Sequence, residues 1–155
     1  MRMNPRGKVV SVNISPEKGT RKTNVIQSCL LPEFGLKEDA HAGKWHRQVS
    51  LLAMESISKM VRLGLKVGPG DFAENITTQG LDLLKLPVGT KFRIGGISLL
   101  EVTQIGKVCH TRCAIYYQAG DCVMPKEGIF AKVLEGGEIR VGDEIHVLGG
   151  DSDHQ

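Results

Sequence analysis

The sequence contains no long apolar run. No stretch approaches the roughly 18 residues that a membrane-spanning helix needs. Residues 1–13, MRMNPRGKVVSVN, also contain no apolar segment of the kind found in signal peptides. We therefore expect a cytoplasmic protein with no membrane partner.

A strong excess of one charge is also missing. The 20 Lys and Arg residues and the 17 Asp and Glu residues are mixed along most of the chain, and the net charge is +3. This charge is too small to indicate nucleic-acid binding, so any bound anion should be small and local. Because 155 residues are about the length of one domain, we expect a single domain over residues 1–155. Its core should cover about 6–148, with a flexible tail at 149–155.

The chain has only four cysteines. Cytosolic thiols are kept reduced, so we expect free thiols or metal ligands rather than disulfides. Cys29 stands in the apolar stretch VIQSCLL, and we interpret it as a core residue. The other three, Cys109, Cys113 and Cys122, lie within residues 107–122, KVCHTRCAIYYQAGDC. This concentration makes the segment the first candidate for chemistry.

Glycine, by contrast, is abundant. Its 19 residues are spread along the chain, and short β-branched segments lie between them, which indicates turns between many strands. Strands are predicted at residues 7–14, 48–52, 91–106 and 143–148. PVGTKFRI (87–94) and RVGDEIHV (140–147) share the pattern Val-Gly-x-x-apolar-basic-apolar. Each predicts a turn that leads into an alternating strand.

Two segments have apolar residues at helical spacing. The first is residues 53–64, which end in a glycine and contain Met54, Ile57, Met60 and Val61. The second is residues 125–137, which begin with a proline, end in two glycines and contain Ile129, Phe130, Val133 and Leu134. Because predicted strands still outnumber helices, we predict a mainly β fold, a small barrel-like domain with a few short α-helices.

Cys113 directly follows Arg112, and nearby positive charge favours a reactive thiol. A free thiol with a pKa of about 8.5 is mostly protonated at neutral pH, whereas neighbouring cationic groups lower thiol pKa values to about 3.5–7.5. Lys107 and His110 are close in sequence as well. The thiolate would bind a soft metal or carry sulfur as a persulfide, and the residues do not separate these roles. Cys109 would resolve a persulfide, support the site or belong to the hydrophobic core. For Cys122 the sequence favours neither a core residue nor a functional thiol.

Zinc is the alternative from another class of protein. Cys109, His110, Cys113 and Cys122 would supply four ligands of the types that zinc binds tetrahedrally. Structural zinc sites usually combine two paired motifs such as C-x2-4-C, and here only Cys109 and Cys113 form one. The spacing therefore favours a reactive thiol over a structural zinc module.

Five segments together resemble the MOSC domain, which forms the C-terminal domain of eukaryotic molybdenum-cofactor sulfurases and single-domain proteins in many bacteria. They follow the family's order over about residues 6–148: KGTRK (18–22), HAGKWHRQVSLL (41–52), GDFAENITTQGLDLLKLPVGTKFRIG (70–95), the Thr-Arg-Cys of CHTRCAIYY (109–117) and GIFAKVLEGGEIRVGDEI (128–145). The resemblance implies a β-rich, barrel-like fold with Arg112 and Cys113 at its site. Cys113 would hold either a sulfur atom or the metal of the cofactor.

The cofactor implied by this resemblance is the molybdenum cofactor, a phosphorylated pterin that carries molybdenum or tungsten. Its phosphate would suit two groups of basic residues: Lys18, Arg21 and Lys22 in the first, and Lys44, His46 and Arg47 in the second. Trp45, the single tryptophan, would stand at the rim of that pocket. Asn75 matches a family position near the cofactor cleft, or it is a turn residue.

The resemblance also implies partners. A cysteine desulfurase or a molybdoenzyme would act in trans, because the chain has no room for the pyridoxal-phosphate domain of the sulfurases, and no pyridoxal phosphate site is expected here. The family's reductases carry an additional N-terminal barrel that is missing as well. Molybdenum-dependent reduction of N-hydroxylated compounds is therefore an alternative by analogy.

Overall fold

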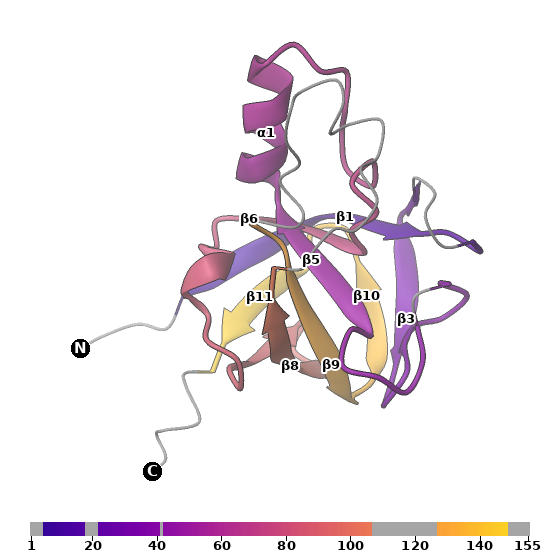
Figure 1. Cartoon of the computed structure of the whole chain (residues 1–155). Coiled ribbons are helices and arrows are strands. Elements are labelled where there is room, and N and C mark those ends of the chain that lie inside the picture. Colours follow the sequence, from indigo (N-terminus) through magenta and orange to yellow (C-terminus); the bar gives the residue numbers. More distant parts are fainter. Residues whose placement is uncertain (1–4, 18–21, 41, 107–126, 149–155) are drawn as a thin grey trace.

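Seven strands close into a barrel in the computed structural model, which describes residues 5–17, 22–40, 42–106 and 127–148 (Figure 1). They pair in the order β11-β7-β8-β9-β5-β6-β1, and β1 pairs again with β11. Their bounds are β1 Arg6–Ile14, β5 Val49–Ala53, β6 Ile76–Gln79, β7 Lys91–Ile94, β8 Ser98–Ile105, β9 Ile129–Glu135 and β11 Glu144–Val147. The predicted mainly β, barrel-like fold is confirmed.

The main hydrophobic core fills the barrel. Alternate residues of each strand point inward, because successive side chains of a strand face opposite sides. In β7 and β8, for example, Phe92, Ile94, Leu100 and Val102 are buried, whereas Arg93 between the first two is partly exposed. Burial of each such side chain stabilises the fold by about 1.5–3 kcal/mol. The barrel is therefore a packed core, and ligand sites must lie at its ends or on its outer face.

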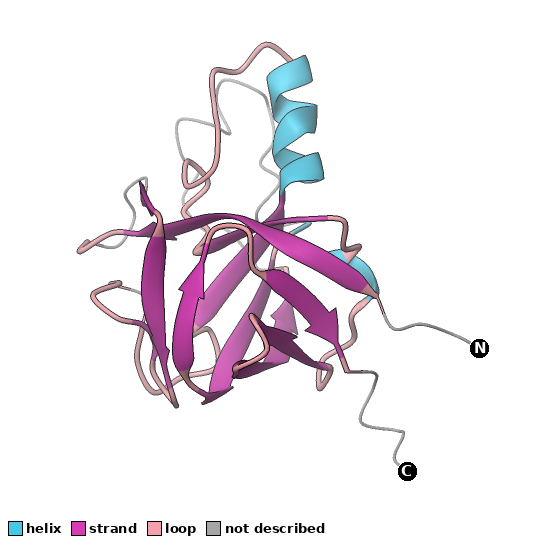
Figure 2. Ribbon diagram, turned by 180° about the vertical axis from the view of Figure 1, so that it is seen from behind, coloured by secondary structure: helices cyan, strands magenta, loops and turns pink. Residues whose placement is uncertain are grey.

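A single α-helix stands over one end of the barrel among the described residues (Figures 1 and 2). Helix α1 (Met54–Arg62) directly follows β5, and its Ile57 and Met60 pack with Leu52, Phe72 and Phe130 in a second hydrophobic cluster. The predicted helix at residues 53–64 is confirmed, although Val61 faces solvent. A 3-10 turn, η1 (Leu83–Lys85), is also present. No helix in the described ranges has the length and apolarity to cross a bilayer.

The predicted helix at residues 125–137 is wrong. Its residues 129–135 form strand β9, which lies between β5 and β8. Ile129, Ala131 and Val133 face the barrel core, and Phe130 faces the second cluster beneath α1. A strand buried on both faces gives a nearly continuous apolar run, which cannot be distinguished from a helix by spacing alone. The two terminal glycines lead into the next strand instead of capping a helix.

The predicted strand at residues 91–106 is two strands. β7 and β8 form an antiparallel hairpin, and Gly95 and Gly96 make the turn between them with positive φ. The repeated Val-Gly pattern does mark two turns that lead into strands, because Gly89 and Gly142 have φ values of 99° and 97° and precede β7 and β11. These two strands pair with each other in the barrel.

A separate sheet of three strands, β10-β3-β4, lies outside the barrel order, and β2 (Thr23–Val25) extends the barrel sheet beside β1. The three strands are β10 Gly137–Arg140, β3 Gln27–Leu31 and β4 Gly35–Leu36. Cys29 lies in β3, where its thiol is free and exposed. Our prediction of a core cysteine is wrong, because strand alternation buries its neighbour Leu30 instead.

Candidate functional site

The segment that carries Cys113 starts and ends at neighbouring points of the barrel. Residues 107–126 lie outside the described residues, and with them the predicted Cys109, His110, Arg112, Cys113 and Cys122. Their flanks are described: β8 leads into Gly106, and Gly128 leads into β9. The Gly106 N–H donates to the Gly128 carbonyl oxygen over 2.7 Å. The thiol segment is therefore an insertion between two adjacent barrel strands, and we call this hydrogen-bonded pair its root.

His46, a predicted cofactor residue, contacts this root through Gln104. Gln104 Nε2 donates to the Gly106 carbonyl oxygen over 2.7 Å, and His46 Nε2 lies 2.7 Å from Gln104 Oε1. The Thr103 hydroxyl donates to the backbone carbonyl oxygen of His46 and so fixes the loop against β8. Residues 42–48 are therefore held beside the point where the thiol segment leaves the barrel.

Arg47 lies against the same pair of strands. Its guanidinium carbon is 4.9 Å from the centre of the Trp45 ring and 5.6 Å from that of Phe130, which is the register partner of Gln104. Arg47 Nε is buried and has no hydrogen-bond partner in the described part of the chain. A buried donor without an acceptor is costly, and an incoming anion would satisfy it.

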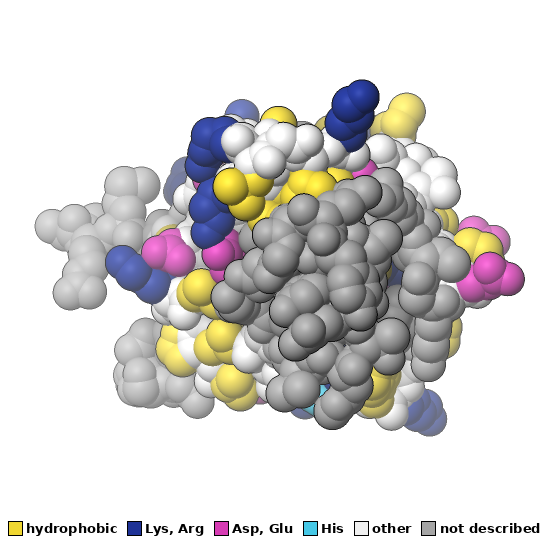
Figure 3. Space-filling model, turned by 45° about the horizontal axis from the view of Figure 1, so that its top comes forward, with side chains coloured by type: hydrophobic (Ala, Val, Ile, Leu, Met, Phe, Trp, Pro, Cys, Tyr) yellow, Lys and Arg dark blue, Asp and Glu magenta, His cyan; other side chains and the backbone are white. Residues whose placement is uncertain are grey.

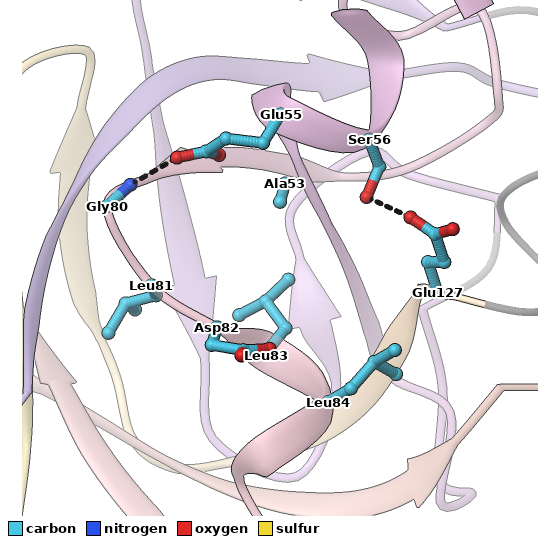
Figure 4. A pocket seen from close by; sticks show the side chains of 9 residues that line it. All are labelled: Ala53, Glu55, Ser56, Gly80, Leu81, Asp82, Leu83, Leu84 and Glu127. Carbon is cyan, nitrogen blue, oxygen red and sulfur yellow. Dashed lines mark hydrogen bonds between the residues drawn. The ribbon is translucent and has the colours of Figure 1, made fainter. Parts of the chain in front are cut away.

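A pocket of about 350 Å³ lies between α1 and η1 and is lined in part by Glu127, which precedes Gly128 of the root (Figure 4). The Ser56 hydroxyl donates to Glu127 Oε1 over 2.5 Å, and Lys59 pairs with the same carboxylate. Glu55 accepts a hydrogen bond from the Gly80 N–H over 3.0 Å. The rest of the lining is Ala53, Leu81, Asp82, Leu83 and Leu84. Three carboxylates on an apolar surface make this pocket unsuited to a phosphate.

Lys22 and Asn75, both predicted to contact the cofactor, come together at Asp39. Lys22 Nζ lies 2.7 Å from Asp39 Oδ1, and both side chains are fully buried. Burial alone would raise the pKa of Asp39, but hydrogen bonds from Lys22 and Asn75, together with the Lys22 charge, hold it below its usual value of 3.8. The Ser15 N–H also donates to this carboxylate over 3.0 Å. The ion pair thus ties the chain that follows residues 18–21 to the loop after β4.

Asn75 joins three strands of the barrel. Its Oδ1 accepts a hydrogen bond from the Ser50 N–H over 2.9 Å, and its Nδ2 lies 3.2 Å from the Asn13 carbonyl oxygen. The side chain is fully buried at the start of β6, between β1 and β5. Asn75 therefore positions the strand that follows the loop of residues 42–48 and is more than a turn residue.

Glu74 is a buried acid that no sequence pattern indicated. Its Oε2 accepts hydrogen bonds from the Gly70 N–H over 2.8 Å and the Thr77 hydroxyl over 2.7 Å, whereas its Oε1 has no partner within the described ranges. Burial raises the pKa of this carboxyl, and the hydrogen bonds from Gly70 and Thr77 only partly oppose the shift. No sequence signal separates this glutamate from an exposed one in a turn.

The described members of the two predicted basic groups do not form one cluster. Lys22 lies in the pair with Asp39, and Arg47 lies between two aromatic rings, while Lys18 and Arg21 are outside the described residues. On the face shown in Figure 3, most of the visible Lys and Arg side chains lie toward the left edge, and another lies near the top. Nor do the described His, Cys, Asp and Glu residues form a group of three that could hold a metal ion. Among the described members of both groups, His46 reaches the root through Gln104, and Arg47 packs on Phe130 of the adjoining strand.

Comparison with known proteins identifies the family. The family described as "MOSC domain" matches residues 38–146. YuaD from Bacillus subtilis has a similar structure, with a TM-score of 0.75 and 18% identity over 92% of this chain and 95% of that one. YiiM from Geobacillus stearothermophilus has a TM-score of 0.68 and 21% identity over 92% and 75% of the two chains. YiiM from Escherichia coli has a TM-score of 0.63 and 19% identity over 96% and 71%.

At these identities the solved structures support the fold alone, and no curated protein matches the chain in sequence. The family match covers well over half of the chain, including the thiol segment and both flanks of its root. The barrel with this insertion is therefore a molybdenum-cofactor-associated domain in the general sense. The chain belongs to the MOSC domain family.

Proposed function

We propose that this domain binds the molybdenum cofactor, or accepts sulfur for its maturation, at the thiol of Cys113. The observation that carries the proposal is the position of His46 and Arg47. His46 hydrogen bonds Gln104, Arg47 packs on Phe130, and these two strand residues are register partners next to the root of the segment that contains Cys113. Residues far apart in sequence therefore meet where that segment enters the barrel fold.

The donors at the root fit an anionic cofactor. Arg47 Nε is buried without an acceptor among the described residues, and a guanidinium pairs well with phosphate oxygens while its charge stays fixed. Arg47 and His46 would hold the pterin phosphate, and Arg112 would keep Cys113 as a thiolate. When bound, the cofactor would supply a metal centre ligated by sulfur, for which a thiolate is a suitable ligand. The stacking of Arg47 on two rings orients its guanidinium before any anion arrives.

The proposal is tested by purifying the wild-type, Cys113→Ser and Arg47→Ala proteins from an anaerobically grown host. Metal content, pterin content and intact mass are measured on the same samples. We expect Cys113→Ser to lose the metal or an adduct with the mass of one sulfur atom. Arg47→Ala should bind the cofactor more weakly by about 1.5–3 kcal/mol, the range for a hydrogen bond to a charged group. Arg62→Ala, at the exposed end of α1, is the matched control.

The outcome also separates the two roles of the thiol. Stoichiometric molybdenum or tungsten in the wild type indicates ligation, whereas the sulfur adduct alone indicates a sulfur carrier that works with a desulfurase or a molybdoenzyme. A Cys113→Ser protein that keeps its metal and pterin contradicts the proposal. Tightly bound zinc that is lost together with the fold on chelation contradicts it as well, because structural zinc contributes folding free energy directly.

A further inference from the structure

Two apolar side chains are exposed at the end of α1 that lies away from the barrel. Leu63 is 68% exposed and Val61 is 47% exposed, whereas Ile57 and Met60 of the same helix are buried in the second cluster. Because α1 projects from the barrel end, this end of the helix is open to another molecule (Figures 1 and 2). We call residues 61–63 the helix tip. Neighbouring apolar side chains that stay exposed in the folded chain are a mark of interaction surfaces.

The helix tip is also positively charged. Arg62 lies between the two apolar residues, and residues 56–70 contain three cationic residues and no acidic residue. The Arg62 guanidinium forms no ion pair with another described residue. The tip therefore presents an apolar surface together with a cation that no described carboxylate neutralises. A surface of this kind favours an occupant that combines apolar and acidic groups.

The other end of α1 has the complementary properties. The pocket of about 350 Å³ between α1 and η1 combines leucine side chains with acidic groups (Figure 4). Leu83 and Leu84 belong to η1, and Leu84 is 44% exposed. Glu55 accepts a hydrogen bond from the Gly80 N–H, but it forms no ion pair with a described cation. The pocket therefore suits an apolar side chain that has a cation beside it.

The acidic and basic ends of α1 lie on one side of the helix. Glu55 and Arg62 are close to two full turns apart, so both side chains leave the helix in nearly the same direction. Lys59, which lies between them on this side, is already paired with Glu127. Ser58, near the middle of the helix, is small and partly exposed, so a second helix can approach closely there. A second α1 that crosses antiparallel at Ser58 would place its basic end beside the acidic end of the first.

We propose that two copies of this chain pair through antiparallel α1 helices, with the helix tip of each copy in the pocket of the other. Leu63 of one copy packs against Leu84 of the second, and Arg62 pairs with Glu55. A two-fold axis makes every contact twice, because the same surface is used on both copies. A parallel arrangement is disfavoured, since it would bring like charges together. The pairing uses no residue that the proposed function requires.

Sedimentation velocity and size-exclusion chromatography with light scattering, both on the intact protein, test the proposal. We expect the mass to rise from one chain to two as the protein concentration increases through the micromolar range. Added salt should weaken the association, because it screens the exposed charges. Leu63→Asp should weaken it about tenfold or more, since it places an acid against the acidic pocket. Ile97→Asp is the matched control, because Ile97 is 61% exposed and lies at the end of β8 opposite to Gly106.

Charge reversals test the pairing of the two helix ends. Arg62→Glu and Glu55→Arg each create two repulsive contacts in a dimer of identical copies, so each variant alone should be monomeric. A mixture of the two variants should form a one-to-one heterodimer, because every contact then joins opposite charges. Circular dichroism establishes that each variant is folded, and Cys113→Ser should dimerise like the wild type.

Three outcomes overturn the proposal. The first is a wild-type protein that remains monomeric at millimolar concentration. The second is a Leu63→Asp protein that dimerises like the wild type and like Ile97→Asp, which would place the interface elsewhere on the surface. The third is a pair of folded charge variants that do not associate when they are mixed. If either charge variant does not fold, the comparison of Leu63→Asp with Ile97→Asp decides.

Discussion

Replacing Lys22 with methionine should destabilise the fold strongly, because it leaves the Asp39 carboxylate buried without its cation. The Lys22 Nζ and Asp39 Oδ1 atoms are 2.7 Å apart, and neither side chain is exposed. Removing one partner of such a pair costs about 3–5 kcal/mol. Since small domains have a total free energy of unfolding of about 5–15 kcal/mol, the loss is a large fraction of the stability. Urea denaturation, followed by the fluorescence of Trp45, measures it.

The pH dependence of this loss gives an independent check. In the wild type the pKa of Asp39 is lowered, so its stabilising contribution is present above about 3.8 and is lost as the pH falls through the lower folded-state pKa. In Lys22→Met, burial acts without the opposing cation and raises the pKa of Asp39. The variant carboxyl then takes up a proton under mildly acidic conditions. The stability difference from the wild type should therefore shrink from neutral pH toward about pH 5.

A second substitution separates lost charge from lost packing. Lys22→Met/Asp39→Asn removes the carboxylate charge that Lys22 neutralises in the wild type, and the asparagine Oδ1 can still accept the Ser15 hydrogen bond of 3.0 Å. The double variant should recover much of the stability that Lys22→Met loses, whereas the exposed control Lys66→Met should resemble the wild type. The prediction fails if Lys22→Met costs less than about 1 kcal/mol, the upper range for a surface pair, or if the double variant is no more stable than the single one.

Two further predictions concern a tightly packed glycine and a buried acid. Gly136→Ala should cost about 1–3 kcal/mol of folding free energy, as overpacking does, because its Cβ would meet the Leu30 carbonyl oxygen and lie 2.8 Å from Pro32 Cδ. Thermal denaturation measures this loss, and Gly68→Ala, with no atom within 4 Å of the new Cβ, is the matched control. Equal midpoints for the two variants would contradict the packing argument. Glu74→Gln should flatten the pH profile of stability. Burial raises the folded-state pKa of Glu74, so the wild type loses stability as the pH rises from about 4.5 through that pKa. The glutamine variant has no carboxyl group to titrate at this position and does not lose stability in this way. Melting temperatures from acidic to neutral pH measure this difference, and parallel profiles for the two proteins would disprove it.

The barrel was predictable because short glycine-bounded strands carry a strong local signal. The Val-Gly turns before β7 and β11 are examples, since their positive φ values are a property of the glycines themselves. The pairing of these two strands was not predictable from the pattern, because register depends on the whole barrel. Strand β9 shows the same limit, since its apolar residues have helical spacing only because both of its faces are covered.

In the candidate site, the chemistry of the side chains was predictable from the sequence, and their positions were not. The residue types of Arg112, Cys113, His46 and Arg47 are enough to indicate their chemistry, because charge and thiol reactivity belong to the side chains themselves. Their positions did not follow from sequence. Lys22 has the same charge as Arg47, yet tertiary packing gives Lys22 a buried carboxylate partner and leaves Arg47 Nε without an acceptor in the described part of the chain.

The family, the strand-rich composition and the types of side chain available for binding an anion all follow from the amino-acid sequence. Which of these side chains stabilise the barrel, and which remain available to a ligand, depends on the folded arrangement. A hydrogen bond or ion pair requires a short distance and a particular degree of desolvation, and both are set by chain segments that lie far away in sequence. Gln104 and Phe130 place His46 and Arg47 at the root through such contacts, and no local pattern contains them.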